Sequence, residues 1–287
     1  ACPWSPGGPA APAPALASPT VWHENETARS RLALPPSHPL APSILIVGEC
    51  SGAFRDACNA MLPGHHAISC DYRRSESEGG LHYCGDVRDI LWSRRWELVV
   101  AHPPCAAAAK SNKGGLAGRI QDGSHFNGIA FFLLLYCAPA RRFIGEQPAS
   151  DLADCFRPPD QVMRPTDFGV PFDKQWCLWT RGVGAFAPTA VVPATAAPPH
   201  RTISFDPLER GHARAATPHM MATGIVGQLD MSTPAGGSQP TFSVEIERLA
   251  SRYAELWPLP EGYSHPLAMA PPPSRWLLSV SAASGGA

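Results

Sequence analysis

The chain of 287 residues lacks the features that mark several large classes of protein. It has no excess of either charge, with 23 Lys and Arg residues against 24 Asp and Glu residues. The overall basic composition that many nucleic-acid-binding domains show is therefore missing, although local basic patches are not excluded. No apolar run reaches the roughly 18 residues of a transmembrane helix. We therefore expect no membrane partner.

The nine cysteines form no CxxC pair, and their number is odd. Structural zinc sites commonly use such pairs, so we expect no metal centre. Most of the cysteines lie within apolar stretches, which is typical of reduced, intracellular proteins. We expect an intracellular monomer, in either the cytoplasm or the nucleus.

Proline is abundant, with 33 residues that gather toward the two ends of the chain. Residues 1–42 are rich in Pro, Ala and Ser, and such a segment buries too little apolar surface to offset the entropy of ordering it. We predict that residues 1–42 and 261–287 are disordered. Between them we expect a catalytic domain over 43–230, a linker over 231–241 and a C-terminal helix over 242–260.

Short β-branched runs alternate with segments of helical spacing from residue 43 onward. The pattern predicts strands over 43–49, 67–72, 80–87, 97–105, 141–148 and part of 168–183, and helices over 50–62, 88–96, 124–138, 216–229 and 243–257. This alternation predicts a doubly wound, Rossmann-like α/β fold with a mostly parallel sheet and helices on both faces.

Polar side chains stand at or just after the ends of five of these strands. They are Glu49, Asp71, Asp86, Cys105 and Glu146. In an open α/β sheet the ligand site lies beyond the carboxyl ends of the strands. We therefore expect these five residues to converge on one edge of the sheet.

The first of these strand ends is suited to a nucleoside cofactor. The small-residue turn 49–52 would let a ligand approach the backbone at a helix N-terminus. Asp71, about 20 residues further on, is placed to hold ribose hydroxyls. Asp86 could accept a hydrogen bond from an adenine amino group. Each acid alone could equally be a helix cap or a solvated turn residue.

The fourth and fifth strand ends carry a thiol and a carboxylate. Pro103 and Pro104 cannot continue a strand ladder, because proline donates no backbone N–H, so Cys105 is presented just past the break. A buried packing role is the commoner fate of a cysteine. Glu146 precedes Gln147 and Pro148 at the end of an apolar strand, an unusual place for a solvated charge.

Eight short motifs follow one another in a specific order. They are Glu49-Cys50-Ser51-Gly52, Arg55-Asp56-Ala57, Ser69-Cys70-Asp71, Gly85-Asp86-Val87, Ala101-His102-Pro103-Pro104-Cys105, Glu146-Gln147-Pro148, Lys174-Gln175-Trp176-Cys177-Leu178-Trp179 and Pro188-Thr189. Over about residues 44–230 this order resembles the cytosine-C5 DNA methyltransferases, and most closely a compact group of phage-encoded DNA cytosine methyltransferases.

The resemblance implies transfer of a methyl group from S-adenosylmethionine to C5 of cytosine in DNA. It implies that Cys105 is the nucleophile that attacks C6 of the base and that Glu146 holds ring N3. The cofactor contacts that it implies are Glu49, Cys50, Ser51, Gly52, Asp71, Asp86, Val87 and Pro103. The DNA or substrate contacts that it implies are His102, Pro104, Lys110, Gln147, Pro148 and Lys174.

The chain departs from the family pattern at several positions. Gln147 replaces an Asn, Phe172 replaces a Gln, and Lys174 and Trp176 replace two Arg residues. The stretch 186–215 is too short for a full target-recognition domain, so we expect a substrate with minimal sequence context or a single strand.

Two other functions stay open at this point. One is amino methylation of cytosine N4 or adenine N6, which uses an Asp/Asn-Pro-Pro-aromatic turn; here His102 and Cys105 flank the prolines instead. The other is a degenerate methyltransferase that only binds nucleic acid.

Overall fold

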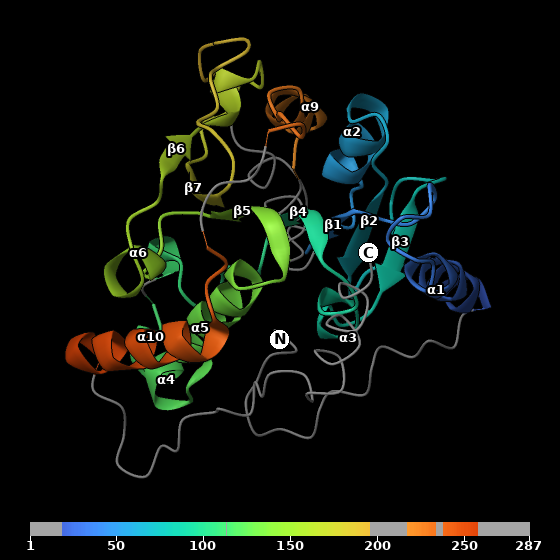
Figure 1. The fold of residues 1–287 in the computed structure, drawn as a ribbon. Coiled ribbons are helices and arrows are strands. Elements are labelled where there is room, and N and C mark those ends of the chain that lie inside the picture. The colour runs from blue at the N-terminus through green and yellow to red at the C-terminus, as the bar shows by residue number, and fades with distance from the viewer. Residues whose placement is uncertain (1–18, 113, 196–216, 234–237, 258–287) are drawn as a thin grey trace.

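The protein is built around one sheet of seven strands. The computed structural model describes residues 19–112, 114–195, 217–233 and 238–257 (Figure 1). The strands lie in the order β3-β2-β1-β4-β5-β7-β6. Their bounds are β1 Ile44–Val47, β2 Ala67–Asp71, β3 Leu81–Cys84, β4 Trp96–Ala101, β5 Ala140–Gln147, β6 Gln161–Met163 and β7 Trp176–Arg181.

Strands β1 to β5 are parallel, and β7 runs antiparallel to both of its neighbours. The order β3-β2-β1-β4-β5 is that of a doubly wound sheet, in which the direction of winding reverses between β1 and β4. The predicted mostly parallel α/β fold is therefore confirmed. The sequence did not predict β6, which pairs with β7 at the edge of the sheet.

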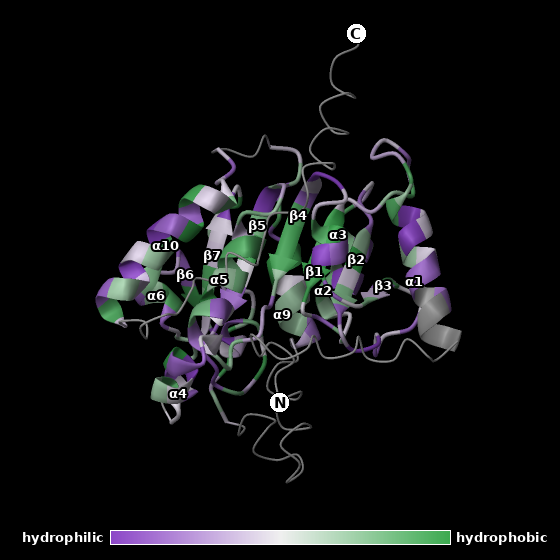
Figure 2. Cartoon of the chain, turned by 90° about the horizontal axis from the view of Figure 1, so that it is seen from below, coloured by the Kyte–Doolittle hydropathy of each residue, from purple (hydrophilic) through white to green (hydrophobic). Residues whose placement is uncertain are grey.

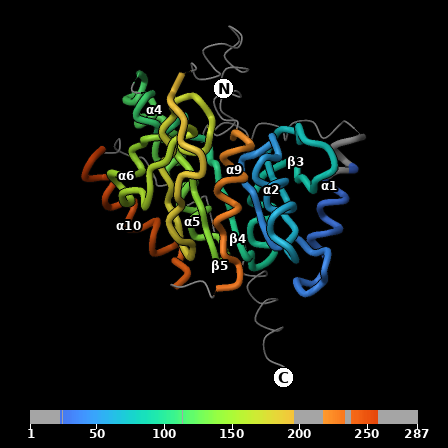
Figure 3. Tube along the Cα trace, turned by 90° about the horizontal axis from the view of Figure 1, so that it is seen from above, coloured from blue at the N-terminus to red at the C-terminus, as the bar shows by residue number. Residues whose placement is uncertain are grey.

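Helices cover both faces of the sheet. On one face α2 (Ala53–Met61) lies beside α9 (His219–Val226), as Figure 3 shows from above. The other face is covered by α3 (Arg88–Leu91), α5 (Ser124–Tyr136), α6 (Leu152–Cys155) and α10 (Phe242–Leu256), with α4 (Leu116–Gln121) beside α5. Two short 3-10 turns are Lys110–Asn112 and Pro165–Asp167.

The apolar strands are explained by this double cover. Along β1, Leu45 and Val47 join the core under α5, whereas Ile44 and Ile46 join the core under α2 and α9. Because both faces are buried, every position of the strand favours an apolar residue. Figure 2 shows the same result as hydrophobic central strands between amphipathic helices.

The N-terminal segment differs from the prediction. Disorder was predicted for residues 1–42, but α1 (Pro19–Leu32) is a helix packed along β3. The side chain of Asn25 donates to the carbonyl of Cys84 and accepts from its N–H, at 2.9 and 2.8 Å. Ala28 is fully buried. The prediction was wrong here because a composition averaged over 42 residues conceals a proline-poor helical stretch that covers the sheet edge. Residues 1–18, and the predicted disordered tail 261–287, lie outside the described residues.

Two other predicted elements end earlier than expected. The helix predicted over 88–96 stops at Leu91, and Trp96 instead begins β4. The strand predicted over 97–105 stops at Ala101, because His102 is followed by two prolines that cannot pair. Cys105 therefore lies in a loop four residues past the strand. The C-terminal helix, predicted over 242–260, corresponds to α10, which ends at Leu256 and packs against α5 and α6. Residues 258–260 lie outside the described residues.

A buried histidine on β3 joins the sheet to the loop that follows β2. His82 is 3% exposed, and its Nε2–H donates to the carbonyl of Arg73 at 2.8 Å. Its Nδ1 accepts from the Ser69 hydroxyl at 2.9 Å. Burial lowers the pKa of His82 to about 4. The folded state therefore favours the neutral ring.

We expect the stability of the protein to fall as the pH drops from about 6.5 to about 4. The unfolded chain binds a proton at His82 near pH 6.5, whereas the folded chain does so only near pH 4. The free energy of unfolding is therefore higher above pH 6.5 than below pH 4 by roughly 3 kcal/mol, and this difference is lost as the pH falls through that range. His125, whose pKa is also lowered by burial, changes the stability in the same direction.

Urea unfolding measures this effect. The free energy of unfolding of His82→Gln should depend less steeply on pH than that of the wild type. The His23→Gln variant, which removes an exposed ring, should keep the slope of the wild type. Equal slopes for wild type and His82→Gln would contradict the assignment.

Candidate functional site

The carboxyl ends of β1, β2 and β3 lie side by side, and they carry the first three predicted polar groups. Val47 pairs with Cys70, and Asp71 pairs with Cys84. The turn 49–52, Asp71 and Asp86 therefore follow three neighbouring strands, as the sequence predicted.

The turn after β1 brings backbone close to the end of β4. Gly48 has a φ of 72°, and a methyl group added there would lie 2.2 Å from the carbonyl oxygen of His102. Gly52 has a φ of 78° at the start of α2. Both positions favour glycine, because other residues rarely adopt this conformation. The two glycines therefore let the turn pack closely against the end of β4 and against the loop 72–80.

The Glu49 side chain turns inward from this loop. Its two carboxylate oxygens accept from the N–H groups of Phe54 and Arg55, at 2.8 and 3.3 Å. An acid that satisfies the first amides of a helix stabilises the helix N-terminus. Glu49 thus shapes the turn, and a contact between its side chain and a cofactor stays a prediction.

Asp71 and Asp86 differ in their surroundings. Asp71 is half-buried, and its carboxylate accepts from the N–H of Arg73 at 2.8 Å. Asp86 accepts from the backbone and the guanidinium of Arg88, each at 2.9 Å. Burial opposes ionisation of Asp86, but the hydrogen bonds from Arg88 outweigh it and lower its pKa. The lowered pKa keeps Asp86 charged at neutral pH, and the carboxylate oxygens of both residues could accept from hydroxyl or amino groups.

A buried arginine braces the loop 72–80 beside these acids. Arg55 is fully buried, and its guanidinium donates to the hydroxyls of Ser69 and Ser75 and to the carboxylate of Asp56. The Ser77 carbonyl accepts a further bond at 3.4 Å. The charge is thus matched by one acid and several acceptors, which a buried guanidinium requires. The motif Arg55-Asp56-Ala57 therefore has a structural role in holding the loop.

The second part of the site lies where β4 and β5 end. Ala101 pairs with Gly145, so His102 and Glu146 follow at the same level. Nδ1 of His102 lies 3.6 Å from Oε2 of Glu146, and both side chains are about nine-tenths buried. The imidazole lies between Phe54 and Trp176, with ring centroids 5.2 and 5.8 Å away.

Three buried polar atoms in this cluster have no hydrogen-bond partner among the described residues. They are Nε2 of His102, Oε1 of Glu146 and Nε1 of Trp176. A buried polar atom without a partner costs about 1–3 kcal/mol, and more when it is charged. Such a cost is commonly retained at sites where a ligand supplies the missing bonds.

The loops after β4 and β5 are joined by several hydrogen bonds. Nε2 of Gln147 donates to the carbonyl of Pro103 at 2.7 Å. Further along, the N–H of Lys110 donates to Ala149 and the N–H of Asp151 donates to Ala108, both at 2.9 Å. The loop that bears Cys105 is therefore held against the loop that follows Glu146. Gln147, which stands where the resemblance leads us to expect an Asn, therefore fixes the Pro103-Pro104 turn.

Cys105 is the only exposed cysteine in the described ranges. Its carbonyl accepts from the N–H groups of Ala108 and Ala109, at 3.1 and 2.9 Å, so it opens a tight turn. Burial raises the pKa of Cys58, Cys137 and Cys155 to about 12, which makes them poor nucleophiles. Among the described thiols, Cys105 is the one that a substrate can reach.

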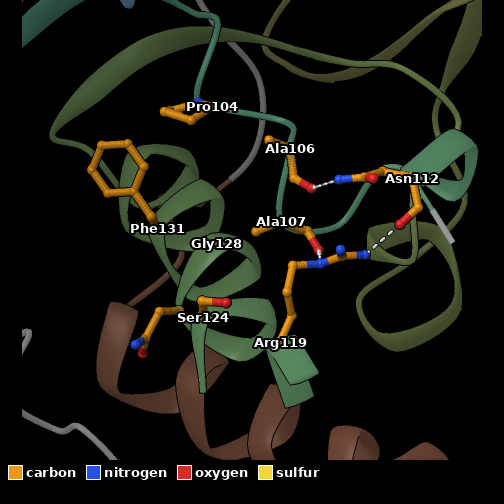
Figure 4. A pocket seen from close by; sticks show the side chains of 9 residues that line it. Pro104, Ala106, Ala107, Asn112, Arg119, Ser124, Gly128 and Phe131 are labelled. Atoms are coloured by element: carbon orange, nitrogen blue, oxygen red, sulfur yellow. Dashed lines mark hydrogen bonds between the residues drawn. The ribbon is translucent and has the colours of Figure 1, made fainter. Parts of the chain in front are cut away.

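A second arginine clamps the loop that follows Cys105. The guanidinium of Arg119 donates to the carbonyls of Ala107 and Gly114, each at 3.0 Å, and to that of Asn112. Figure 4 shows the bonds to Ala107 and Asn112. The Asn112 amide in turn donates to the Ala106 carbonyl at 2.9 Å. These bonds hold the backbone on both sides of the turn, and no local sequence signal pointed to them.

We expect Arg119→Lys to loosen this loop without unfolding the protein. An ammonium group cannot reproduce the planar fork of the guanidinium, and the loss of about two hydrogen bonds should cost about 1–3 kcal/mol locally. Hydrogen exchange of a peptide spanning 103–115 should then be about 10- to 100-fold faster. Arg141→Lys, at an exposed ion pair with Glu97, is the matched control. Unchanged exchange in Arg119→Lys would show that the loop is held by other contacts.

The predicted DNA contacts are scattered around this edge. Lys110 is ion-paired with Asp154 at 2.8 Å, and that hydrogen bond raises its pKa. The ammonium of Lys174 lies 5.2 Å from the centre of the Trp176 ring. Pro148 is half-buried, and Pro104 is exposed next to Cys105. Of the predicted cofactor contacts, Val87 and Pro103 are buried, and Cys50 donates weakly to Glu76.

Phe54 and Trp176 enclose the His102 ring, and the sequence did not assign them to the site. A signal existed for Trp176, which lies within the motif 174–179 noted in the sequence. Phe54 gave no signal apart from its place on the first helix.

No family model matches the chain, and no curated protein matches it significantly. The resemblance drawn above therefore rests on the order of its motifs. Within the described residues, no group of three or more His, Cys, Asp or Glu side chains is arranged to hold a metal ion. In the same part of the chain, every helix is too short or too polar to cross a membrane.

Proposed function

We propose that this protein transfers a methyl group from S-adenosylmethionine to C5 of cytosine in DNA. The observation that carries the proposal is the buried Oε1 of Glu146, which lacks a partner among the described residues. It lies beside His102, and Gln147, the next residue of β5, donates a hydrogen bond to the loop that bears the exposed Cys105. A base that donates an amino proton to this oxygen would remove the cost of leaving it unpaired.

The thiol and the carboxylate supply complementary steps of this chemistry. The Cys105 thiolate adds to C6 of cytosine, which forms an S–C6 bond and moves the electron pair of the C5–C6 double bond toward C5 and N3. Glu146 holds N3 and the exocyclic amine and so stabilises the charge that the addition creates. When bound, S-adenosylmethionine supplies the electrophilic methyl group. Once C5 had taken that methyl group and the methyl–sulfur bond had broken, loss of the C5 proton to water and cleavage of the S–C6 bond would restore the aromatic ring and the thiolate.

The residues at the ends of β1 to β3 are suited to hold S-adenosylmethionine. Gly48 lets the turn after β1 lie close to the end of β4, since a side chain at this position would collide with the His102 carbonyl. Asp71 would accept from the ribose hydroxyls and Asp86 from the adenine amino group, as in other nucleoside sites at strand ends. The backbone of the turn 49–52 would lie against the remainder of the cofactor.

We expect Asp71→Asn to weaken S-adenosylmethionine binding by about 10- to 100-fold. The substitution keeps the size of the side chain but removes the charge that strengthens its hydrogen bonds to hydroxyls, worth about 1.5–3 kcal/mol. Isothermal titration calorimetry measures the affinity directly. Glu78→Gln, on the exposed part of the neighbouring loop, should bind the cofactor normally. An unchanged affinity in Asp71→Asn would remove Asp71 from the cofactor site.

The experiment that tests the function is incubation of the protein with DNA and isotope-labelled S-adenosylmethionine, followed by nucleoside mass spectrometry. The expected product is labelled 5-methylcytosine. Labelled N4-methylcytosine or N6-methyladenine would instead establish amino methylation. DNA binding without a methylated product or cofactor binding would establish a degenerate binding module.

A further inference from the structure

A pocket of about 160 Å³ lies against the loop that carries Cys105 (Figure 4). One wall comes from the loop after β4 and the other from α5, and the main lining residues are Pro104, Ala107, Ser124, Asn127, Gly128 and Phe131. Its size is close to the 150 Å³ of a cavity that holds one benzene molecule. The pocket is therefore large enough for a single aromatic ring.

The chemistry of the pocket favours a flat, neutral ring over a charged group. Its lining is mainly apolar, and Figure 4 shows the Phe131 and Pro104 rings near one end of it. Polar groups at Ser124 and Asn127 add hydrogen-bonding partners for a ring edge. The guanidinium of Arg119 already donates hydrogen bonds to three loop carbonyls. A phosphate would therefore compete with bonds that the arginine already makes.

The pocket is preformed. The Ala107 side chain lies so close to Gly128 that a methyl group added at Gly128 would be 2.7 Å from it. The loop wall is further fixed by the bonds from Arg119 and Asn112. A ligand that enters the pocket therefore loses little free energy to ordering of the protein.

We infer that this pocket binds the base next to the target cytosine on the same strand. The inference rests on the proposed function, because Pro104 and Ala106, which line the pocket, directly flank the nucleophile Cys105. Consecutive bases can occupy two separate sites only if both leave the duplex stack. The preferred substrate is then single-stranded or locally unpaired DNA, held by contact of one base with Phe131 and Pro104.

The test uses single-stranded oligonucleotides that contain one cytosine, with an abasic site on its 5′ side, on its 3′ side or at neither. One of the two neighbouring abasic sites should lower kcat/KM and binding affinity by about 5- to 100-fold, the scale of one base stacked on a protein ring. An abasic site four nucleotides away should have no such effect. The intact single strand should also be preferred over the same sequence in a duplex.

A second test changes the protein. Asn127→Leu places a larger apolar side chain at the pocket wall. Gln121→Leu, on the exposed side of α4, is the matched control. Asn127→Leu should weaken binding of the intact oligonucleotide. It should not further weaken binding of the oligonucleotide whose abasic site lowers the affinity, because the substitution and the missing base remove the same contact. Equal losses on both oligonucleotides, or no effect of either abasic site, would overturn the inference.

These experiments distinguish a wrong assignment of the pocket from a wrong proposed function. Methylation without a neighbour effect would overturn only the pocket assignment. A neighbour effect on affinity, measured by fluorescence anisotropy, in the absence of any methylated cytosine would overturn only the proposed reaction.

Discussion

Replacement of Cys105 by serine should abolish methyl transfer while leaving S-adenosylmethionine binding intact. Serine keeps the shape of the side chain, but its hydroxyl is a far weaker nucleophile than a thiolate. Removal of a covalent nucleophile from an enzyme typically costs at least about 10⁴-fold in kcat. The cofactor contacts proposed for β1 to β3 come from other strand ends, so the affinity measured by calorimetry should not change.

Covalent trapping gives a second measurement of the same assignment. When C5 of cytosine carries fluorine, the proton that must leave before the thiol is absent, so the adduct should persist on a denaturing gel. The band should depend on Cys105 and on S-adenosylmethionine. Cys137→Ala, which removes a buried thiol, is the control and should still form the band. An active wild-type protein that forms no Cys105-dependent adduct would exclude Cys105 as the nucleophile and favour amino methylation.

Replacement of Glu146 by glutamine should lower kcat by about 10²- to 10⁴-fold, the usual range for loss of a group that assists proton transfer or charge stabilisation. Glutamine fills the same volume, but an amide cannot exchange a proton with N3 of the base as the carboxyl group of Glu146 can. The affinity for S-adenosylmethionine should be retained, because Glu146 lies on β5, which β1 and β4 separate from β2 and β3 in the sheet.

Glu97→Gln is the matched control for this effect. Glu97 lies at the start of β4, at the opposite end of the strand, and its carboxylate is paired with Arg141 and Arg142. Its replacement should leave kcat within about twofold of the wild type. A Glu146→Gln enzyme that keeps more than a tenth of the wild-type kcat would show that the carboxylate does not stabilise the reacting base.

The approximate positions of the parallel strands followed from the sequence alone, although their exact ends did not. A strand buried on both faces needs a continuous apolar run, and residues 44–47 and 98–101 are such runs. Each run ends where a glycine or proline breaks the ladder, and these breaks are read from single residues. The order of helices and strands then specifies a parallel sheet, and a parallel sheet brings its carboxyl ends to one edge. Both the fold class and the gathering of Asp71, Asp86 and Glu146 at one edge were therefore predictable.

Other features depended on contacts between residues far apart in the chain. Asn25 meets Cys84 across 59 residues, and Gln147 meets Pro103 across 44. Neither contact has a periodicity or a local spacing that would reveal it. The N-terminal helix was missed for this reason, because its stability comes from packing against β3 rather than from its own composition.

The environment of the candidate site was likewise decided only in three dimensions. The sequence alone identified Cys105 and Glu146 as chemically notable, since residue type and position at a strand end are local properties. The exposure of Cys105 and the burial of Glu146 depend instead on residues far away in the chain. The Cys105 loop is positioned by Arg119 and Gln147, and the His102–Glu146 pair is enclosed by Phe54 and Trp176. Burial, hydrogen-bond partners and unpaired polar atoms are properties of the packed chain, because they depend on which side chains from other strands and helices fill the space around each group.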